Sequence, residues 1–468
     1  MGGIFGIARK GDCVIDLFYG TDYLSHLGTK RGGMAVAGPK GFAWRIRRLE
    51  SGYFRDKLEP SLRTFSGNLG VGAISDTDAQ PLTFRSHLGR FAVATVARIT
   101  NAAELAAEAE HACGVFSESS DGKVRFTELV AMLLSREKTF EDGIRAVHEK
   151  VKGSCTFIIM TPNGLYGCRD KLGRTPLTLG KTSDGYALSS ESCAFHNLGF
   201  EPVRDLGPGE AVFLTPDGYE TRIAPGDAMQ MCAFLWVYYG YPSSDYEGIN
   251  VEAFRYRCGA YLGREDDVDV DFVGGIPDSG IGHAVGYANS RNLPYKRPIA
   301  KYTPTWPRSF MPQNQASREL VAKMKLIPNR ALIEGQRMVF LDDSIVRGTQ
   351  LRDNARILHA YGAKEVHMRI ACPPLVYPCE FLNFSSSRSA LELIGLKAIL
   401  DIEGKEGKDI HRYVDANDPK NAVMTEWIRN RLDLGSLKFQ KMDNLIKAIG
   451  LPKEKLCTHC WDGSSWGH

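Results

Sequence analysis

Short apolar runs bounded by turn residues dominate the chain up to about Gly226. They include residues 91–96, 155–160 and 210–214, and Gly, Asp and Pro separate them. One helical pattern, over residues 126–135, follows the turn-like segment 119–122. This pattern of short strands with few helices predicts an α+β domain with packed, largely antiparallel sheets over residues 1–226.

The pattern changes after Gly226, where apolar strands alternate with helical periods. The clearest unit is a buried-strand run at 338–341, a helical pattern at 351–361 and a second strand at 365–371. Such a βαβ unit is typical of a parallel sheet covered by helices. We therefore predict an α/β domain over residues 227–468, with the charged segment 401–421 as a surface excursion.

Charge and hydropathy narrow the function classes. The 468 residues carry 58 Lys and Arg against 55 Asp and Glu, a net charge of +3, and no run of basic residues. This balance argues against a dedicated nucleic-acid binder or a membrane-surface protein. The most apolar stretch, residues 231–237, is far shorter than the roughly 20 residues of a membrane span. The N-terminus lacks the pattern of a secretory signal, so we expect a cytoplasmic location.

The 11 cysteines are an odd number scattered through a large chain. This does not resemble a secreted disulfide framework. In a reducing compartment we expect thiols, unless a metal holds some of them.

The sharpest chemical motif is the ten-residue segment 340–349. Asp342 and Asp343 end a buried parallel strand, where open α/β sheets bind ligands. The next residues lead into a helix, whose N–H groups can receive a phosphate, and Gly348 permits close approach. The predicted phosphate-binding residues are Ser344, Ile345, Val346, Arg347, Gly348 and Thr349. An ordinary strand followed by an Asp-rich helix cap is the structural alternative.

This segment resembles the phosphoribosylpyrophosphate (PRPP) loop of type I phosphoribosyltransferases. Among these it is most similar to the glutamine PRPP amidotransferase family, which also has a Pro-Asp-Ser-Gly turn like residues 277–280. The resemblance implies that Ser279, Asp342 and Asp343 hold Mg²⁺. It also implies that Lys301, Arg308 in a flexible loop and Lys325 neutralise the pyrophosphate leaving group. Residues 302–307 depart from the family's loop, and a solvated surface loop is the alternative for these basic residues.

A CxxC pair lies near the C-terminus, at Cys457 and Cys460. Alone it is compatible with zinc, redox chemistry or coincidence. The segments around Cys232 and Cys379 resemble those that carry cluster ligands in the iron-sulfur subgroup of the same family. The resemblance implies that these four cysteines bind a structural 4Fe-4S cluster, with Zn²⁺ as the rival and four free thiols as the plain alternative. The remaining cysteines are interpreted as core residues or unreactive thiols: Cys13, Cys113, Cys155, Cys168, Cys193, Cys258 and Cys372.

The first domain resembles the family's class II glutaminase domain, an αββα fold of the N-terminal-nucleophile type. Residues 3–7, 79–81, 169–173, 190–194 and 207–211 carry the resemblance. The expected chemistry needs an N-terminal cysteine, but Gly2 stands there. Ser75 replaces the arginine that binds the glutamine carboxylate, and Val96 and Ala97 replace the Asn-Gly oxyanion pair. The Asp that would recognise the glutamine amine falls near Phe126. Cys13 is the alternative nucleophile, but it is not N-terminal and no base is evident beside it.

These departures predict an inactive glutaminase domain, although Gly2 alone could be an engineered change. The resulting hypothesis is an enzyme that forms 5-phosphoribosylamine and pyrophosphate from PRPP and ammonia. The ammonia would be free or supplied by a separate glutaminase, and the resemblance implies a homotetramer. The alternatives are a non-catalytic regulatory paralogue that binds PRPP or nucleotides, and a phosphoribosyltransferase that uses another amine.

Overall fold

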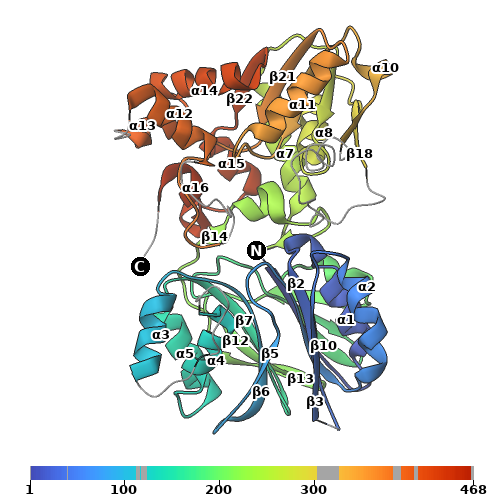
Figure 1. Ribbon diagram of the computed structural model, residues 1–468, viewed down its shortest axis with the longest axis vertical. Helices are drawn as coiled ribbons and strands as arrows, with labels where there is room; N and C mark the ends of the chain where they lie inside the picture. Colours follow the sequence, from blue (N-terminus) through green and yellow to red (C-terminus); the bar gives the residue numbers. More distant parts are fainter. Residues whose placement is uncertain are drawn as a thin grey trace.

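The computed structural model describes residues 2–39, 41–111, 116, 124–302, 326–382, 392–404 and 409–464. Two lobes stack along its long axis, the first half of the chain below and the second above (Figure 1). Among the described residues, no helix is both long and apolar enough to cross a membrane.

The lower lobe is a sandwich of two antiparallel sheets. The first sheet has the order β11-β9-β10-β1-β4-β2-β3 and the second the order β13-β12-β8-β7-β6-β5. The first contains β1 (Gly2–Arg9), β2 (Arg31–Gly38), β3 (Gly41–Arg48), β4 (Leu69–Ser75), β9 (Thr178–Thr182), β10 (Gly185–Ser189) and β11 (Glu201–Asp205). The second contains β5 (Leu82–Ser86), β6 (Gly89–Ile99), β7 (Gly153–Thr161), β8 (Gly164–Cys168), β12 (Ala211–Thr215) and β13 (Gly218–Ile223).

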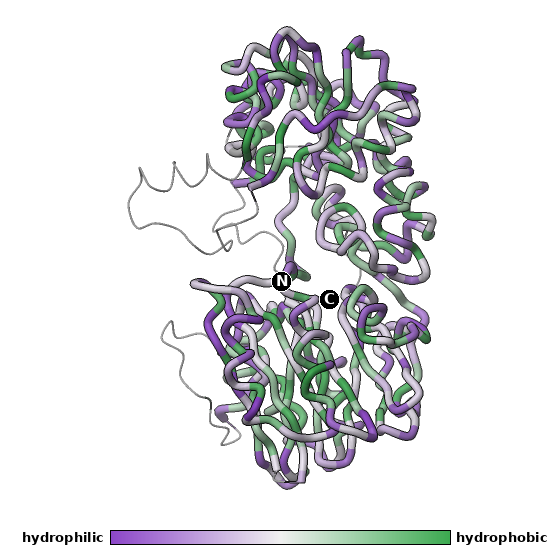
Figure 2. The backbone as a smooth tube through the Cα atoms, turned by 90° about the vertical axis from the view of Figure 1, so that its right-hand side faces the viewer, coloured by the Kyte–Doolittle hydropathy of each residue, from purple (hydrophilic) through white to green (hydrophobic). Residues whose placement is uncertain are grey.

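Three hydrophobic layers hold this sandwich together. Ile4, Val71 and Ile158 lie in the layer between the sheets, because alternate side chains of each strand face inward. The outer face of the first sheet is covered by α1 (Val14–Asp22), α2 (Phe54–Leu58) and α6 (Cys193–His196). The outer face of the second is covered by α3 (Ala102–His111), α4 (Phe126–Leu134) and α5 (Phe140–Lys150). The predicted αββα class is confirmed, and green hydrophobic stretches run along these strands (Figure 2).

The upper lobe is built on a parallel sheet of order β17-β20-β21-β22. Its strands are β17 (Phe272–Gly275), β20 (Arg337–Asp342), β21 (Glu365–Ile370) and β22 (Ser436–Phe439). Val339 and Leu341 pack against α7 (Val251–Arg264) and α8 (Gly280–Arg291) on one face. Met338 and Phe340 lie in the core of the other face, with α11 (Thr349–Ala360) and α14 (Pro419–Leu432). Both faces are therefore buried, and the predicted parallel α/β class is confirmed.

Smaller elements complete the upper lobe. Its short strand pairs are β14 (Met231–Cys232) with β23 (Leu456–Cys457), β15 (Asp245–Tyr246) with β16 (Ile249–Asn250), and β18 (Ile299–Lys301) with β19 (Leu326–Pro328). The other helices are a π-helix (Leu235–Tyr239), α10 (Arg330–Ile333), α12 (Ile394–Glu403), α13 (Ile410–Val414), α15 (Met442–Ile449) and α16 (His459–Asp462).

The segment 401–421, predicted as a surface excursion, is partly helical, and only Tyr413 is buried among its described residues. Helices α12, α13 and α14 occupy most of this region. Tyr413 is 1% exposed and lies in the same core cluster as Ile399 and Met424. The charged residues lie on the helix surfaces, where Arg412 pairs with Asp418.

Candidate functional site

Two adjacent carboxylates lie at the C-terminal end of β20. Asp342 is the last residue of the strand, and its carboxylate accepts a hydrogen bond from the backbone N–H of Asp343 at 2.9 Å. The Ser344 hydroxyl donates to the Asp343 carboxylate at 2.5 Å. Burial raises the pKa of Asp342 well above its usual range, and the neighbouring Asp343 raises it further. Burial also raises the pKa of Asp343. This proximity of two carboxylates favours a cation between them.

Ser279 meets this pair from the neighbouring strand. It is the N-cap residue of α8, and β17 runs parallel to β20 with Gly275 opposite Leu341. The Ser279 side chain lies near the Asp343 carboxylate and opposes the rise in its pKa, to which burial contributes most. The three residues predicted to hold Mg²⁺ therefore converge, and their hard oxygen atoms suit that ion.

Close backbone packing fixes the approach of α8. A Cβ at Gly280 would lie 2.3 Å from the Leu341 carbonyl oxygen, so only glycine permits this helix to begin against the end of β20. The preceding Asp278 forms an ion pair with Lys301. Lys301 thus lies beside the turn that presents Ser279, whereas Arg308 and Lys325 lie outside the described residues.

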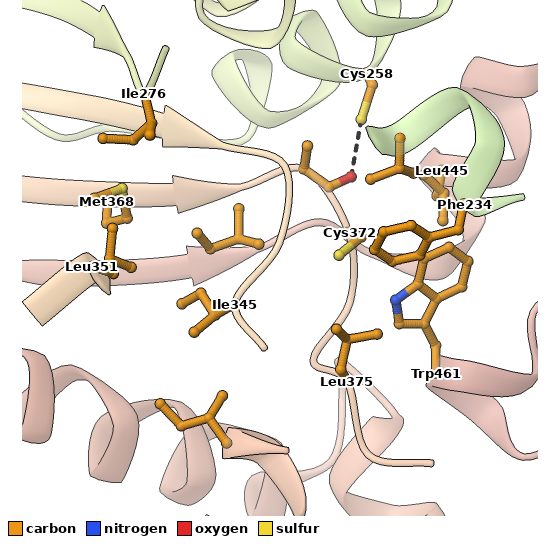
Figure 3. Packing of buried hydrophobic residues seen from close by; sticks show 14 of the residues in the cluster. Phe234, Cys258, Ile276, Ile345, Leu351, Met368, Cys372, Leu375, Leu445 and Trp461 are labelled. Carbon is orange, nitrogen blue, oxygen red and sulfur yellow. Dashed lines mark hydrogen bonds between the residues drawn. The ribbon is translucent and has the colours of Figure 1, made fainter. Parts of the chain in front are cut away.

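The loop from Ser344 to Thr349 leads from β20 into α11. Ile345 is 3% exposed and belongs to the core cluster that also contains Leu351 and Leu375, all three labelled in Figure 3. The Val346 carbonyl accepts a hydrogen bond from the Ile394 N–H at 2.7 Å. Arg347 pairs with Glu392 at 2.5 Å.

Gly348 caps α11 with φ +75°, a left-handed conformation that favours glycine. A Cβ there would lie 2.5 Å from Ile394 Cδ1. The first N–H groups of α11, which begins at Thr349, have no partner within the helix and form an anion-binding end.

Sequence reasoning missed Arg255, on α7. Its side chain is 3% exposed and donates hydrogen bonds to the carbonyls of Trp236, Tyr238 and Gly240 at 2.9–3.1 Å. Its positive charge opposes the rise of the Asp343 pKa, to which burial contributes most. No motif marks this arginine, because only the packing of α7 under the loop brings it to the carboxylate.

A small cavity between the lower lobe and Leu382 of the upper lobe includes the four positions at which glutaminase chemistry was expected to fail. Gly2, Ser75, Val96 and Ala97 line it together with Thr77, Thr95 and Leu382. Strand pairing explains this, because Gly2 lies opposite Ser75 in the β1–β4 register. None of the seven lining residues carries a charge, whereas a second cavity that also includes Gly2 and Val96 is lined by Glu191.

The backbone around Gly2 leaves little room for a side chain. A Cβ at this position would lie 2.6 Å from the Ile74 carbonyl oxygen, closer than real Cβ contacts. Cys13 does not line the cavity and belongs to the core under α1. Burial raises the pKa of the Cys13 thiol to about 12, so it is a poor source of thiolate.

The four cysteines expected to bind metal come from three segments that meet at the join of the two lobes. Cys232 lies opposite Cys457 in the parallel β14–β23 pair. The Cys460 carbonyl accepts hydrogen bonds from Val376 and Tyr377, just before Cys379, at 3.1 Å each. The Cys379 and Cys460 thiols interact directly.

Backbone N–H groups face these sulfurs. The Leu382 N–H donates to Cys379 Sγ at 3.3 Å. Within the described ranges, no three His, Cys, Asp or Glu side chains are grouped so that they could hold a metal ion. The four cysteines nevertheless fit a metal centre by their chemistry, because four thiol groups with N–H donors suit an iron-sulfur cluster or zinc.

The other cysteines in the described parts of the chain are free and buried, as expected, while Cys113 lies outside them. Cys258, for example, donates to the Ala371 carbonyl at 3.2 Å, the dashed contact in Figure 3.

Comparison with known proteins identifies relatives across nearly the whole chain. Residues 69–197 match the family model described as "Glutamine amidotransferase domain". The amidophosphoribosyltransferase of Bacillus subtilis is 32% identical over 461 residues, covering 96% of this chain and 89% of the relative. That of Archaeoglobus fulgidus is 37% identical over 315 residues, covering 67% of this chain and 68% of the relative.

Solved structures agree. The glutamine PRPP amidotransferase of B. subtilis in complex with ADP and GMP superimposes with a TM-score of 0.84 at 29% identity, covering 99% of this chain and 96% of that one. A structure described as the allosteric regulatory enzyme of purine biosynthesis gives 0.83 at 28% identity, covering 99% and 95%. This chain therefore belongs to the amidophosphoribosyltransferase family and is a phosphoribosyltransferase enzyme.

Proposed function

We propose that this enzyme forms 5-phosphoribosylamine from PRPP and ammonia and does not hydrolyse glutamine. The observation that carries the proposal is the contrast between two sites. The upper lobe brings together Ser279, Asp342 and Asp343 before a helix N-terminus, whereas the cavity lined by Gly2, Ser75, Val96 and Ala97 has neither a thiol nor a cation in its lining.

In the proposed reaction the bond between ribose C1 and the pyrophosphate oxygen breaks, and a bond from C1 to the ammonia nitrogen forms. The nitrogen then loses one proton. The N–H groups from Ser344 to Thr349 hold the 5′-phosphate, and Asp342 and Asp343 orient the ribose hydroxyls. Their negative charge also stabilises the positive charge that develops on the ribose ring. Mg²⁺ held by Ser279 and both aspartates would supply positive charge to the leaving pyrophosphate.

Lys301 would add a cation near the pyrophosphate, because its ion pair with Asp278 keeps it beside Ser279. We propose the same role for Arg308 and Lys325.

The lining of the cavities at Gly2 and the packing of Gly2 itself support a glutaminase domain without activity. Free glutamine carries a carboxylate and an ammonium group, and the two cavities that include Gly2 offer the Glu191 carboxylate but neither a cation for the glutamine carboxylate nor a thiol. Gly2 is packed against the Ile74 carbonyl. The ammonia would then come from solution or from a separate glutaminase.

We further propose that the domain boundary falls after residue 226, between the end of β13 at Ile223 and the start of β14 at Met231. Cys232, Cys379, Cys457 and Cys460 would hold a 4Fe-4S cluster or Zn²⁺ that fixes the C-terminal segment to both lobes. A homotetramer and a cytoplasmic location complete the proposal.

The test compares nitrogen sources. Protein purified without oxygen is given PRPP and Mg²⁺ with either ammonium or glutamine, and pyrophosphate and glutamate are measured. We expect pyrophosphate with ammonium and no glutamate from glutamine. Equal rates with glutamine would overturn the loss of glutaminase activity. PRPP binding without turnover would favour a regulatory paralogue, and turnover only with another amine would favour that substrate.

A further inference from the structure

Arg174, in the first domain, has a buried guanidinium whose hydrogen bonds are incomplete. The residue is 3% exposed. Its Nη1 donates to the Gly153 carbonyl at 2.9 Å, whereas its buried Nε and Nη2 reach no oxygen or nitrogen acceptor among the described residues and have the Cys457 sulfur beside them. No ion pair joins this guanidinium to a carboxylate in the described part of the chain. Leaving a buried cation unpaired costs several kcal/mol, so this arrangement points to a missing anion.

The same residue contacts all three cysteine-bearing segments. Its guanidinium carbon lies 3.8 Å from the ring centroid of Phe381, two residues after Cys379. Its side chain faces the Cys457 sulfur. Its backbone carbonyl accepts a hydrogen bond from the Cys232 N–H at 3.2 Å.

The loop that presents Arg174 is fixed by its own hydrogen bonds. The Asp170 carboxylate accepts the backbone N–H groups of Leu172 and Arg174 at 3.1 and 2.9 Å. Asp170 therefore holds the backbone of the arginine and leaves the guanidinium free to face the sulfurs.

We propose that Arg174 is the counter-charge of a tetrathiolate metal centre and a positioning residue for its ligands. The inference rests on the proposed metal site. Four thiolates around Zn²⁺, or around a cluster core of charge +2, carry a net charge of −2. A guanidinium against that centre stabilises the thiolates and gains the anion that its free N–H groups lack. The contact also ties metal binding to the first domain, which gives that domain a purpose without glutamine hydrolysis.

The test measures metal retention in R174M, R174K and R204M. Arg204 is the matched control, because it is also a first-domain arginine but pairs with Glu210 at 2.6 Å. Iron, sulfide and zinc are quantified in protein purified without oxygen, and metal release to a chelator is followed by absorption. Loss of an outer-shell partner lowers metal affinity about 10- to 100-fold. We expect release from R174M to accelerate in that range, R174K to be intermediate, and R204M to match the unmodified protein.

A double variant distinguishes the loss of the arginine's charge at the metal site from a loss of folding. In C457S, which already lacks one thiolate, adding R174M should change metal retention less than in the intact site. Circular dichroism checks that each variant folds, and an unfolded R174M leaves R174K as the deciding variant. If folded R174M and R174K retain metal as well as R204M does, the proposed role of Arg174 is overturned, whereas the metal site itself is not. Absence of iron and zinc from the unmodified protein would overturn the metal site and this role together, while ammonium-dependent turnover tests the proposed reaction separately.

Discussion

The cavity at Gly2 and the loop after β20 both lie where a sheet presents residues for chemistry, yet they differ in what those residues supply. The loop combines two carboxylates, a hydroxyl and the start of a helix within hydrogen-bonding distance. The cavity is lined by residues of β1, β4 and β6 and by Leu382, all of them neutral, and the carboxylate of Glu191 lines only the adjacent cavity. A fold depends on the apolar layers around such a site, so the sandwich accommodates neutral groups at the positions that line this cavity.

The largest effect should come from the loop. In D343N the site loses half of its paired negative charge, and turnover with PRPP and ammonium should fall about 10²- to 10³-fold. Steady-state pyrophosphate release measures the loss. D353N is the matched control, because the Asp353 side chain is 57% exposed on α11. Equal activity of D343N and unmodified protein would contradict the role of the carboxylate.

The buried carboxylate of Glu191 in the first domain should contribute to the stability of the protein rather than to turnover. Glu191 is 1% exposed and accepts hydrogen bonds from Tyr246 at 2.6 Å and from Ser244 at 3.2 Å, both in the second half of the chain. His26 also pairs with it at 3.0 Å. We expect E191Q to lose about 3 kcal/mol of unfolding free energy, because buried partners are left incompletely paired. Denaturant unfolding measures this loss, and retention of full stability would argue against Glu191 as a link between the lobes.

Restoring the missing nucleophile should not restore the chemistry. In G2C the new Cβ meets the Ile74 carbonyl oxygen at 2.6 Å, and the resulting backbone shift should cost about 1–3 kcal/mol. Glutamate formation from glutamine should stay at background, even in G2C combined with S75R. Measurable glutaminase activity in either variant would contradict the prediction, because it would show that the other residues around Gly2 still support glutamine hydrolysis.

The smallest effect concerns pH. Burial alone would raise the pKa of Glu191, but His26 and the hydrogen bonds to the carboxylate outweigh it and lower the pKa. A lowered folded-state pKa gives stability that is present above the unfolded value of about 4.3 and is lost as pH falls through the folded value. Unmodified protein should therefore lose stability more steeply than E191Q below about pH 4. Parallel pH profiles of the two proteins would contradict this linkage.

Much of this architecture was predictable from local patterns. The runs at 155–160 and 338–341 became β7 and β20, and the helical period at 351–361 became α11 within a residue or two. Such segments are long and strongly periodic, so propensity and packing agree. Helix α5 escaped prediction, although Thr139 caps it by accepting the Asp142 N–H at 3.1 Å, because its mixed composition hides the buried face of Ile144 and Val147.

The amino-acid sequence by itself determined the two fold classes, the Asp342–Asp343 motif and the missing cysteine at position 2. These depend on residue identity and on periods of two or 3.6 residues, which are local properties. Only the tertiary structure decided that Arg255 approaches Asp343 and that Arg174 contacts three cysteine segments. Such contacts join residues on elements far apart in the chain, and the packing of those elements, rather than any spacing in the sequence, sets the distances between charged groups.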